Sequence, residues 1–139
     1  MNMKTGDLMR QVKGVRSTDS VAVLLNGIYI GTNANHKSIM GGDMTTAHWH
    51  NAVPEYAWKR DELMLDRFMR GEGGLLYPRF LKLGDECVPV VSTAALFTIN
   101  GILLIVSITR GFGELTNAHK RILEMTADDY DSPCDCING

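Results

Sequence analysis

The sequence predicts a mainly β fold with flanking helices, and three observations support this prediction. Two Asn-Gly dipeptides, Asn26-Gly27 and Asn100-Gly101, each lie between apolar runs rich in Val, Ile and Leu. A type I′ turn needs positive φ at both central residues, so each Asn-Gly dipeptide predicts a β-hairpin. Residues 54–70 carry apolar side chains at helical spacing and predict a helix between the hairpins. A compact α+β domain with two β-hairpins and three helices is the alternative.

The composition is that of an ordinary globular protein. The chain has 139 residues, 45% apolar and 22% charged, and we expect residues 1–139 to form a single domain. The formal net charge is −2 with both signs mixed along the chain, which argues against strong attraction to nucleic acid or anionic lipid. The unpatterned residues 126–139 are predicted to form a mobile acidic tail.

No segment of the sequence predicts export or membrane insertion. The first ten residues lack the apolar core of a signal peptide, and the most apolar run, residues 94–106, is too short to span a bilayer. The three cysteines are an odd number, which does not indicate a disulfide framework and favours a reducing compartment. We therefore expect a soluble cytoplasmic protein.

The elements before the central helix follow from local patterns. Leu8, Val12 and Val15 recur at helical spacing and predict a short helix over residues 7–16. The arms of both hairpins are apolar on both faces, which is typical of central strands. Residues 36–40 predict a short strand, followed by a glycine turn.

The central helix places Ala57, Met64 and Phe68 on one stripe, which is expected to pack on the core. Its first helical position suits Pro54, and a cluster of glycines ends it near residue 71.

Two strands and a helix are predicted after the central helix. Residues 75–83 predict a strand that Pro78 places at a sheet edge or at a bend. Residues 87–91 predict a second short strand. Residues 114–125 predict an amphipathic helix, with His119 off its apolar stripe and therefore exposed.

Two of the four histidines, His48 and His50, are separated by one residue. In an extended segment their side chains would point to the same side, and Trp49 to the other. Two imidazoles on one side can bind one metal ion, and imidazole suits Zn, Cu, Fe and Ni. The alternative is two histidines in a loop beside a buried tryptophan.

Two thiols near the C-terminus offer a second metal hypothesis. Cys134 and Cys136 could complete a tetrahedral zinc site with His48 and His50. The alternative is a pair of reduced cysteines in a solvated tail. The nearby aspartates lack the spacing and the turn glycine of a calcium loop.

A family resemblance rests on the spacing of Gly42, His48-Trp49-His50 and Glu55, which resembles the first motif of the cupin family. The turn-strand-turn order downstream is also similar, and it is carried by Arg70-Gly71-Glu72-Gly73, Leu83-Gly84-Asp85 and Val88-Pro89. The resemblance covers residues 39–106, about half of the chain. The sequence departs from the family where Ala94 stands near the expected histidine of the second motif.

The cupin resemblance implies a double-stranded β-helix barrel with His48, His50 and Glu55 as metal ligands. The implied cofactor is a divalent transition metal, Fe, Mn, Ni or Zn. Two histidines and one carboxylate leave coordination positions open for substrate, oxygen or water. The metal would then act as a Lewis acid or redox centre on a small organic molecule.

Two classes of function therefore stay open. The first is a cupin-like protein that binds a metal or a small molecule, as an enzyme or without catalysis. The second is a non-catalytic interaction protein, such as a small regulatory, inhibitory or assembly protein, with a protein partner. Its surface anchors would be aromatic and methionine side chains, namely Trp49, Tyr56, Trp58, Met64 and Met69. A homodimer is compatible with either class because strand edges need covering.

Overall fold

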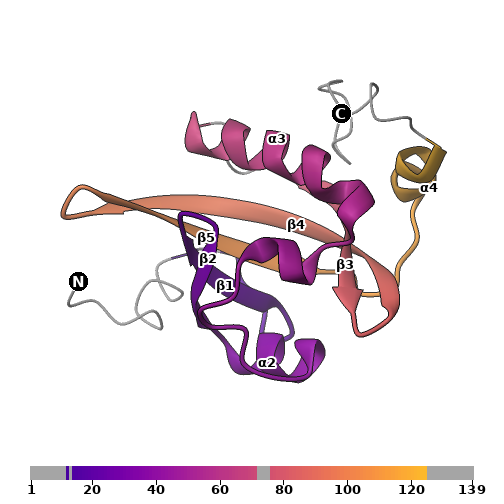
Figure 1. Cartoon of the computed structure of the whole chain (residues 1–139), viewed down its shortest axis with the longest axis horizontal. Coiled ribbons are helices and arrows are strands. Elements are labelled where there is room, and N and C mark those ends of the chain that lie inside the picture. Colours follow the sequence, from indigo (N-terminus) through magenta and orange to yellow (C-terminus); the bar gives the residue numbers. More distant parts are fainter. Residues whose placement is uncertain (1–11, 13, 72–75, 125–139) are drawn as a thin grey trace.

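The computed structural model describes residues 12, 14–71 and 76–124. These residues form a five-stranded antiparallel sheet in the order β2-β1-β5-β4-β3 (Figure 1). The strands are β1 (Ser20–Leu25), β2 (Ile28–Thr32), β3 (Tyr77–Leu83), β4 (Glu86–Ile99) and β5 (Ile102–Arg110). In the described part of the chain β2 and β3 lie at opposite edges of this sheet and do not pair. The sheet is therefore open, and the predicted cupin-like barrel is wrong, whereas the α+β alternative agrees with the structure.

Both predicted hairpins are confirmed. Asn26 and Gly27 have φ of 51° and 81°, and Asn100 and Gly101 have φ of 52° and 79°. Positive φ at both central residues is the signature of the type I′ turn. The arms are not all central, however, because β2 is an edge strand whose side chains alternate between buried and half-buried positions.

The long strand β4 was predicted only in part. Residues 87–91 form its first segment, but the strand continues without interruption to Ile99. Ser92, Ala94 and Ala95 have weak strand propensity, yet they pair with β5 in continuous register. Pairing with the neighbouring strand therefore overrides local propensity.

Pro78 lies in the edge strand β3, as its missing N–H requires.

The predicted strand at residues 36–40 is wrong, because this segment is the helix α2 (Ala34–Met40). Asn33 caps its first turn, since its Oδ1 accepts a hydrogen bond from the backbone N–H of His36 at 2.9 Å. Gly41 ends the helix with φ of 77° and donates its N–H to Lys37. The two caps enforce a helix where the side chains alone resemble a strand.

The central helix is confirmed as a 3₁₀ turn, η2 (Glu55–Ala57), followed by α3 (Trp58–Met69). Its predicted stripe of Ala57, Met64 and Phe68 is buried. In Figure 1, α3 lies along one face of the sheet, over β4 and β5. The C-terminal helix α4 (Asn117–Glu124) packs against β3 and lies within the predicted range.

Strand alternation divides the core between the two faces of the sheet. Ala22 and Leu24 of β1 point to the face covered by α3, where they join Tyr29 and Trp49. Val21, Val23, Leu104, Val106 and Ile108 point to the opposite face, where Val12 and Val15 pack against them. Residues 12 and 14–16 of the predicted helix at residues 7–16 are not helical, and its other residues lie outside the described part of the chain.

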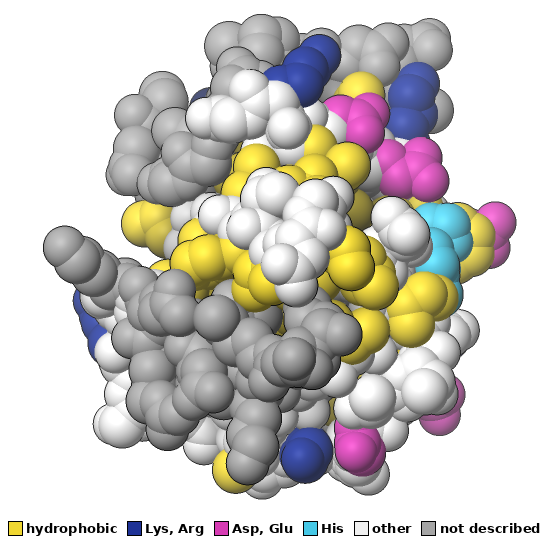
Figure 2. All heavy atoms as spheres, turned by 90° about the vertical axis from the view of Figure 1, so that its left-hand side faces the viewer, with side chains coloured by type: hydrophobic (Ala, Val, Ile, Leu, Met, Phe, Trp, Pro, Cys, Tyr) yellow, Lys and Arg dark blue, Asp and Glu magenta, His cyan; other side chains and the backbone are white. Residues whose placement is uncertain are grey.

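One end of the molecule combines apolar, acidic and imidazole groups. Figure 2 shows hydrophobic side chains gathered on the face that lies at the left of Figure 1, with acidic and histidine side chains beside them. Among the helices of the described residues, none combines the length and the apolar character needed to cross a membrane.

Candidate binding pocket

A backbone ladder places the segment around His48 along the free edge of β2. The Tyr29 N–H donates to Ala47 O at 3.0 Å, the Thr46 N–H donates to Tyr29 O at 2.8 Å, and the Trp49 N–H donates to Gly27 O at 2.9 Å. A single antiparallel bridge also joins Ile28 and His48. The segment therefore satisfies part of the strand edge and carries its side chains to the end of the first hairpin.

The two predicted histidine ligands lie close together, but not as an extended pair. His48 is the N-cap of the 3₁₀ helix η1 (Trp49–Ala52), and its Nδ1 accepts a hydrogen bond from the His50 N–H at 3.1 Å. The ring centroids of the two histidines are 4.4 Å apart in an edge-to-face arrangement. His50 instead stacks on Trp58, with centroids 4.1 Å apart and planes 7° from parallel. Because the local structure is helical, the expected strand alternation does not apply.

The predicted carboxylate does not complete a metal site with these histidines. Glu55 begins η2 and is exposed, whereas the carboxylate beside His50 is Glu62, whose Oε1 lies 3.6 Å from His50 Nε2. Across residues 12, 14–71 and 76–124, no group of three or more His, Cys, Asp and Glu side chains could hold a metal ion. This contradicts the predicted metal-binding character. Occupancy by Fe, Mn, Ni or Zn stays a prediction, and Cys134 and Cys136 lie outside the described residues.

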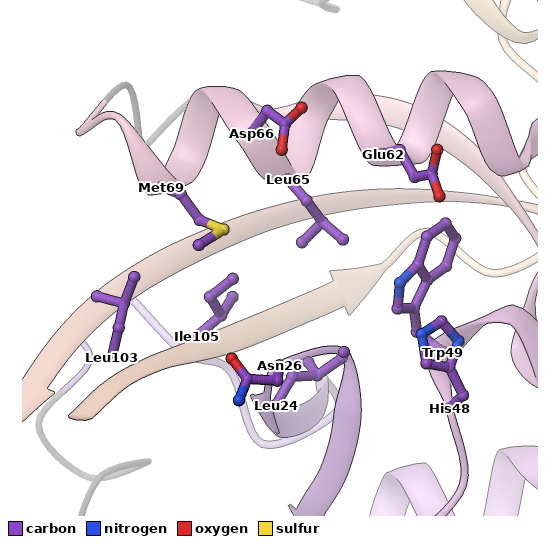
Figure 3. Close-up of a pocket in the computed structure, with 11 residues that line it drawn as sticks. Leu24, Asn26, His48, Trp49, Glu62, Leu65, Asp66, Met69, Leu103 and Ile105 are labelled. Atoms are coloured by element: carbon purple, nitrogen blue, oxygen red, sulfur yellow. The ribbon is translucent and has the colours of Figure 1, made fainter.

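A pocket of about 310 Å³ lies beside His48, between α3 and the hairpin end of the sheet (Figure 3). The helix contributes four lining residues at positions i, i+3, i+4 and i+7, which form one helical face. The sheet contributes apolar side chains from β1 and β5, and the turn and the β2-edge segment close one end. In order, the lining residues are Leu24, Asn26, Gly27, His48, Trp49, Glu62, Leu65, Asp66, Met69, Leu103 and Ile105.

Gly27 allows the close approach that shapes this end of the pocket. A Cβ at this position would lie 2.9 Å from His48 Nε2 and 3.1 Å from Trp49 Cδ1. Its φ of 81° is also a conformation that L side chains rarely adopt. The glycine of the first turn therefore serves both the hairpin and the contact with the imidazole.

A small inner chamber of about 30 Å³ lies behind the pocket. The two cavities share the side chains of Leu24, Trp49, Leu65 and Ile105, which we call the dividing wall. The inner chamber is also lined by Asp61 and Arg79, with Asp61 Oδ2 and Arg79 Nη2 2.8 Å apart. Both residues are almost completely buried.

Burial and pairing perturb the groups around this ion pair. Burial raises the pKa of the Asp61 carboxyl above its ordinary value, and Arg79 and Arg60 oppose that rise. Burial also raises the pKa of Tyr77 to about 12, so its hydroxyl is neutral at neutral pH. Burial lowers the pKa of Arg79, but Asp61 together with Tyr77 and Tyr29 raises it by more, so the guanidinium stays charged.

Arg60 ties the helix to the edge strand on the same side of the sheet. Its Nη1 donates a hydrogen bond to Pro78 O at 2.6 Å.

The sequence pattern of residues 54–70 could have revealed the pocket face of α3, because Glu62, Leu65, Asp66 and Met69 share one helical stripe. No sequence signal links Asp61 to Arg79, because the pair forms only when α3 docks on the sheet.

His119 was predicted to be exposed, and this prediction is wrong. The side chain is fully buried, and its Nε2 lies 2.7 Å from Val90 O. Its Nδ1 lies 2.7 Å from Thr116 Oγ1, so the ring links α4 to β4.

The predicted surface anchors Trp49 and Met64 are also buried, whereas Tyr56 and Met69 are 44% and 51% exposed.

Comparison with known proteins agrees with the open sheet and its helix-covered face. No protein-family model and no curated protein matches the sequence. Among solved structures, the chain is similar to a PAS domain from Desulfitobacterium hafniense, with a TM-score of 0.59 and 11% sequence identity. The match covers 75% of this chain and 97% of that one.

The chain has a PAS-like fold. A PAS domain of nitrogen regulation protein NR(II) from Vibrio parahaemolyticus has a TM-score of 0.55 and 10% identity, covering 68% of this chain and 90% of that chain. A variant PAS-B domain of Drosophila melanogaster Cycle with bound glycerol has a TM-score of 0.51 and 9% identity, covering 65% of this chain and 96% of that one. These likenesses overturn the cupin resemblance and replace the expected barrel with a PAS-like sheet.

Proposed function

We propose that this chain is a non-catalytic sensory domain that binds a small organic molecule in the pocket beneath α3. The pocket carries the proposal, because its volume of about 310 Å³ lies within the range of roughly 300–1,000 Å³ that is typical of ligand sites. Its walls combine the apolar side chains of α3, β1 and β5 with a few polar groups, namely Asn26, His48, Glu62 and Asp66. One of the similar solved structures is a PAS domain from a two-component sensor histidine kinase, which supports a sensory role.

The pocket is built so that a bound molecule would contact several elements at once. The helix α3 provides one wall and β5 provides another, while Trp49 belongs to the segment that pairs with β2. A ligand that fills the space would therefore change the packing of α3 on the sheet. Such a differential contact is what ligand binding needs in order to shift a conformational equilibrium.

The test is a small-molecule fragment screen observed through the backbone amides of the isotope-labelled chain by NMR. We expect binding fragments to shift the amides of Leu24, Leu65 and Ile105 together. A bulky replacement, Leu65→Trp, should fill the pocket and remove these shifts. Leu123→Trp provides a matched control, since Leu123 is 55% exposed on α4 and does not line the pocket. Binding that survives Leu65→Trp, or fragments that shift only residues elsewhere, would contradict the proposal.

A protein partner is the second candidate, and exposed apolar side chains favour it. Met69 and Ile102 are 51% and 38% exposed, and hydrophobic side chains gather on the face shown in Figure 2. A homodimer is the simplest such assembly. Sedimentation analysis over a wide range of protein concentration tests it, and a purely monomeric profile would exclude a homodimer over that range.

A further inference from the structure

The charge of the pocket lining is one-sided. Of the described residues that line it, the charged ones are Glu62 and Asp66, and both are acidic. They lie four residues apart on α3, where two like charges repel each other across one turn and weaken the helix. A positively charged group between them would relieve that repulsion. The lining thus gives the pocket a negative potential at the helix side.

The rest of the pocket provides what an organic cation needs besides a counter-charge. Figure 3 shows Leu65 and Met69 pointing from α3 toward Leu103 and Ile105 of β5, so an apolar space lies below the acidic side chains. The indole of Trp49 lies at the same end as Glu62, and the face of an indole attracts cations.

The buried Arg79 does not make the pocket lining positive. Arg79 lies in the inner chamber, behind the dividing wall, and its charge is neutralised by Asp61 at 2.8 Å. His50 lies 3.6 Å from Glu62, and this imidazole adds a positive charge only when it is protonated. Among the described lining residues, the negative charge of the outer pocket therefore comes from Glu62 and Asp66.

We infer that the ligand of this pocket is a small organic cation, an ammonium or guanidinium group attached to an apolar body. The inference rests on the proposed function and specifies its ligand class. The cation would lie between Glu62 and Asp66, and the apolar body would lie against Leu65, Leu103 and Ile105. The volume of about 310 Å³ limits the body to a short alkyl chain or one aromatic ring.

Matched probes of different charge test this ligand class. Phenethylamine, phenylacetate and 2-phenylethanol share one ring and a two-carbon arm, and they are cationic, anionic and neutral at neutral pH. A second series of butylamine, butyrate and butanol has the same charges on an alkyl body. Binding is measured by NMR titration of the wild-type chain at low ionic strength. We expect the amines to bind most tightly, and to weaken when salt screens the carboxylates.

Charge-neutral variants of nearly equal size locate the effect. Glu62→Gln and Asp66→Asn should each weaken amine binding by roughly two- to fivefold, and together by about tenfold, because each exposed charge pair contributes modestly. Binding of the alcohols should be unchanged. Glu55→Gln is the matched control, because it removes the same charge from η2, outside the pocket.

Three results would overturn the inference. If alcohols or carboxylates bind as tightly as the amines, or if Glu55→Gln weakens amine binding as much as Glu62→Gln, the ligand class is wrong while small-molecule binding stands. If no probe of either series shifts the pocket amides, the inference fails. If the fragment screen also finds no ligand there, the proposed function fails with it.

Discussion

The two cavities beneath α3 share a dividing wall, but the charged residues of one are exposed and those of the other are buried and paired. The outer pocket is open, and its acidic residues Glu62 and Asp66 are exposed to water. The inner chamber encloses Asp61 and Arg79, which are buried and paired at 2.8 Å. A charge exposed to water is solvated and needs no partner, whereas a buried charge needs a partner within the fold to offset its desolvation. The exposed outer acids can therefore interact with a ligand, whereas the buried inner pair stabilises the fold.

The largest expected contrast comes from breaking the inner pair. Arg79→Met leaves Asp61 buried without its partner and should lower the free energy of unfolding by about 3–5 kcal/mol. Adding Asp61→Leu removes both charges and should restore much of this loss. Urea denaturation of the single and double variants measures both effects. A single variant as stable as the wild type would show that Asp61 does not depend on Arg79.

His36 is another buried titratable group, and it lines a third cavity together with Arg79. Burial lowers the pKa of His36 to about 4, against the opposing effect of Asp43. In the unfolded chain the pKa of this histidine is near 6.5. Between pH 4 and 6.5 the unfolded chain is therefore protonated at His36, whereas the folded chain is not. Stability should be complete above about pH 6.5 and should fall by up to about 3 kcal/mol as the pH is lowered to 4.

The measurement for His36 is urea denaturation across this pH range, compared with His36→Gln. The glutamine cannot be protonated, so the variant should lose less stability on acidification than the wild type does. Other acidic groups titrate in both proteins and cancel in the comparison. Identical pH dependence in the two proteins would show that His36 is not the group responsible.

The two Asn-Gly turns provide a smaller and internally controlled test at the pocket side. Gly101 has nothing within 4 Å of the position where a Cβ would lie, whereas Gly27 faces His48 and Trp49. Gly101→Ala should cost about 1 kcal/mol for the left-handed backbone alone, and Gly27→Ala about 2 kcal/mol because the imidazole must also move. Thermal unfolding checks the order, and NMR shifts at His48 check the displacement. Equal costs with no shift at His48 would contradict the contact.

The smallest effect on stability is expected where charge faces water. Asp66→Asn should change the free energy of unfolding by at most about 0.5 kcal/mol, since surface substitutions away from caps and cores rarely do more. Its measurement in the same urea series as Arg79→Met makes the contrast between the cavities quantitative. A loss comparable to that of Arg79→Met would show that Asp66 also has a structural partner.

Local sequence patterns predicted the parts of the fold that local physics determines. The Asn-Gly turns depend on backbone preferences of two residues, and the buried stripe of α3 depends on one helical period. Pattern alone failed for residues 36–40, where the caps Asn33 and Gly41 lie outside the window that resembles a strand. It also failed for His119, whose burial depends on contacts with Thr116 and the distant Val90 O.

The candidate site was predicted in its location more than in its chemistry. The segment around His48 and Trp49 does line the pocket, but the predicted carboxylate Glu55 lies outside it. Glu62 and Asp66 take part because they lie beside Leu65 and Met69, the α3 side chains that point toward β5, and this orientation depends on how the helix docks. The PAS-like topology was beyond the sequence because strand order depends on pairing between residues far apart, such as Ser20 with Thr109.

The segment that lines one end of the pocket is held in place by main-chain hydrogen bonds that link Thr46 and Ala47 to Tyr29, and Trp49 to Gly27. These bonds do not depend on which side chains the segment carries. Position 50 can therefore change without loss of these main-chain bonds, whereas the side chain at position 48 also caps η1. A descendant of this protein could acquire a new chemical preference by a few point substitutions, while its architecture stays as it is.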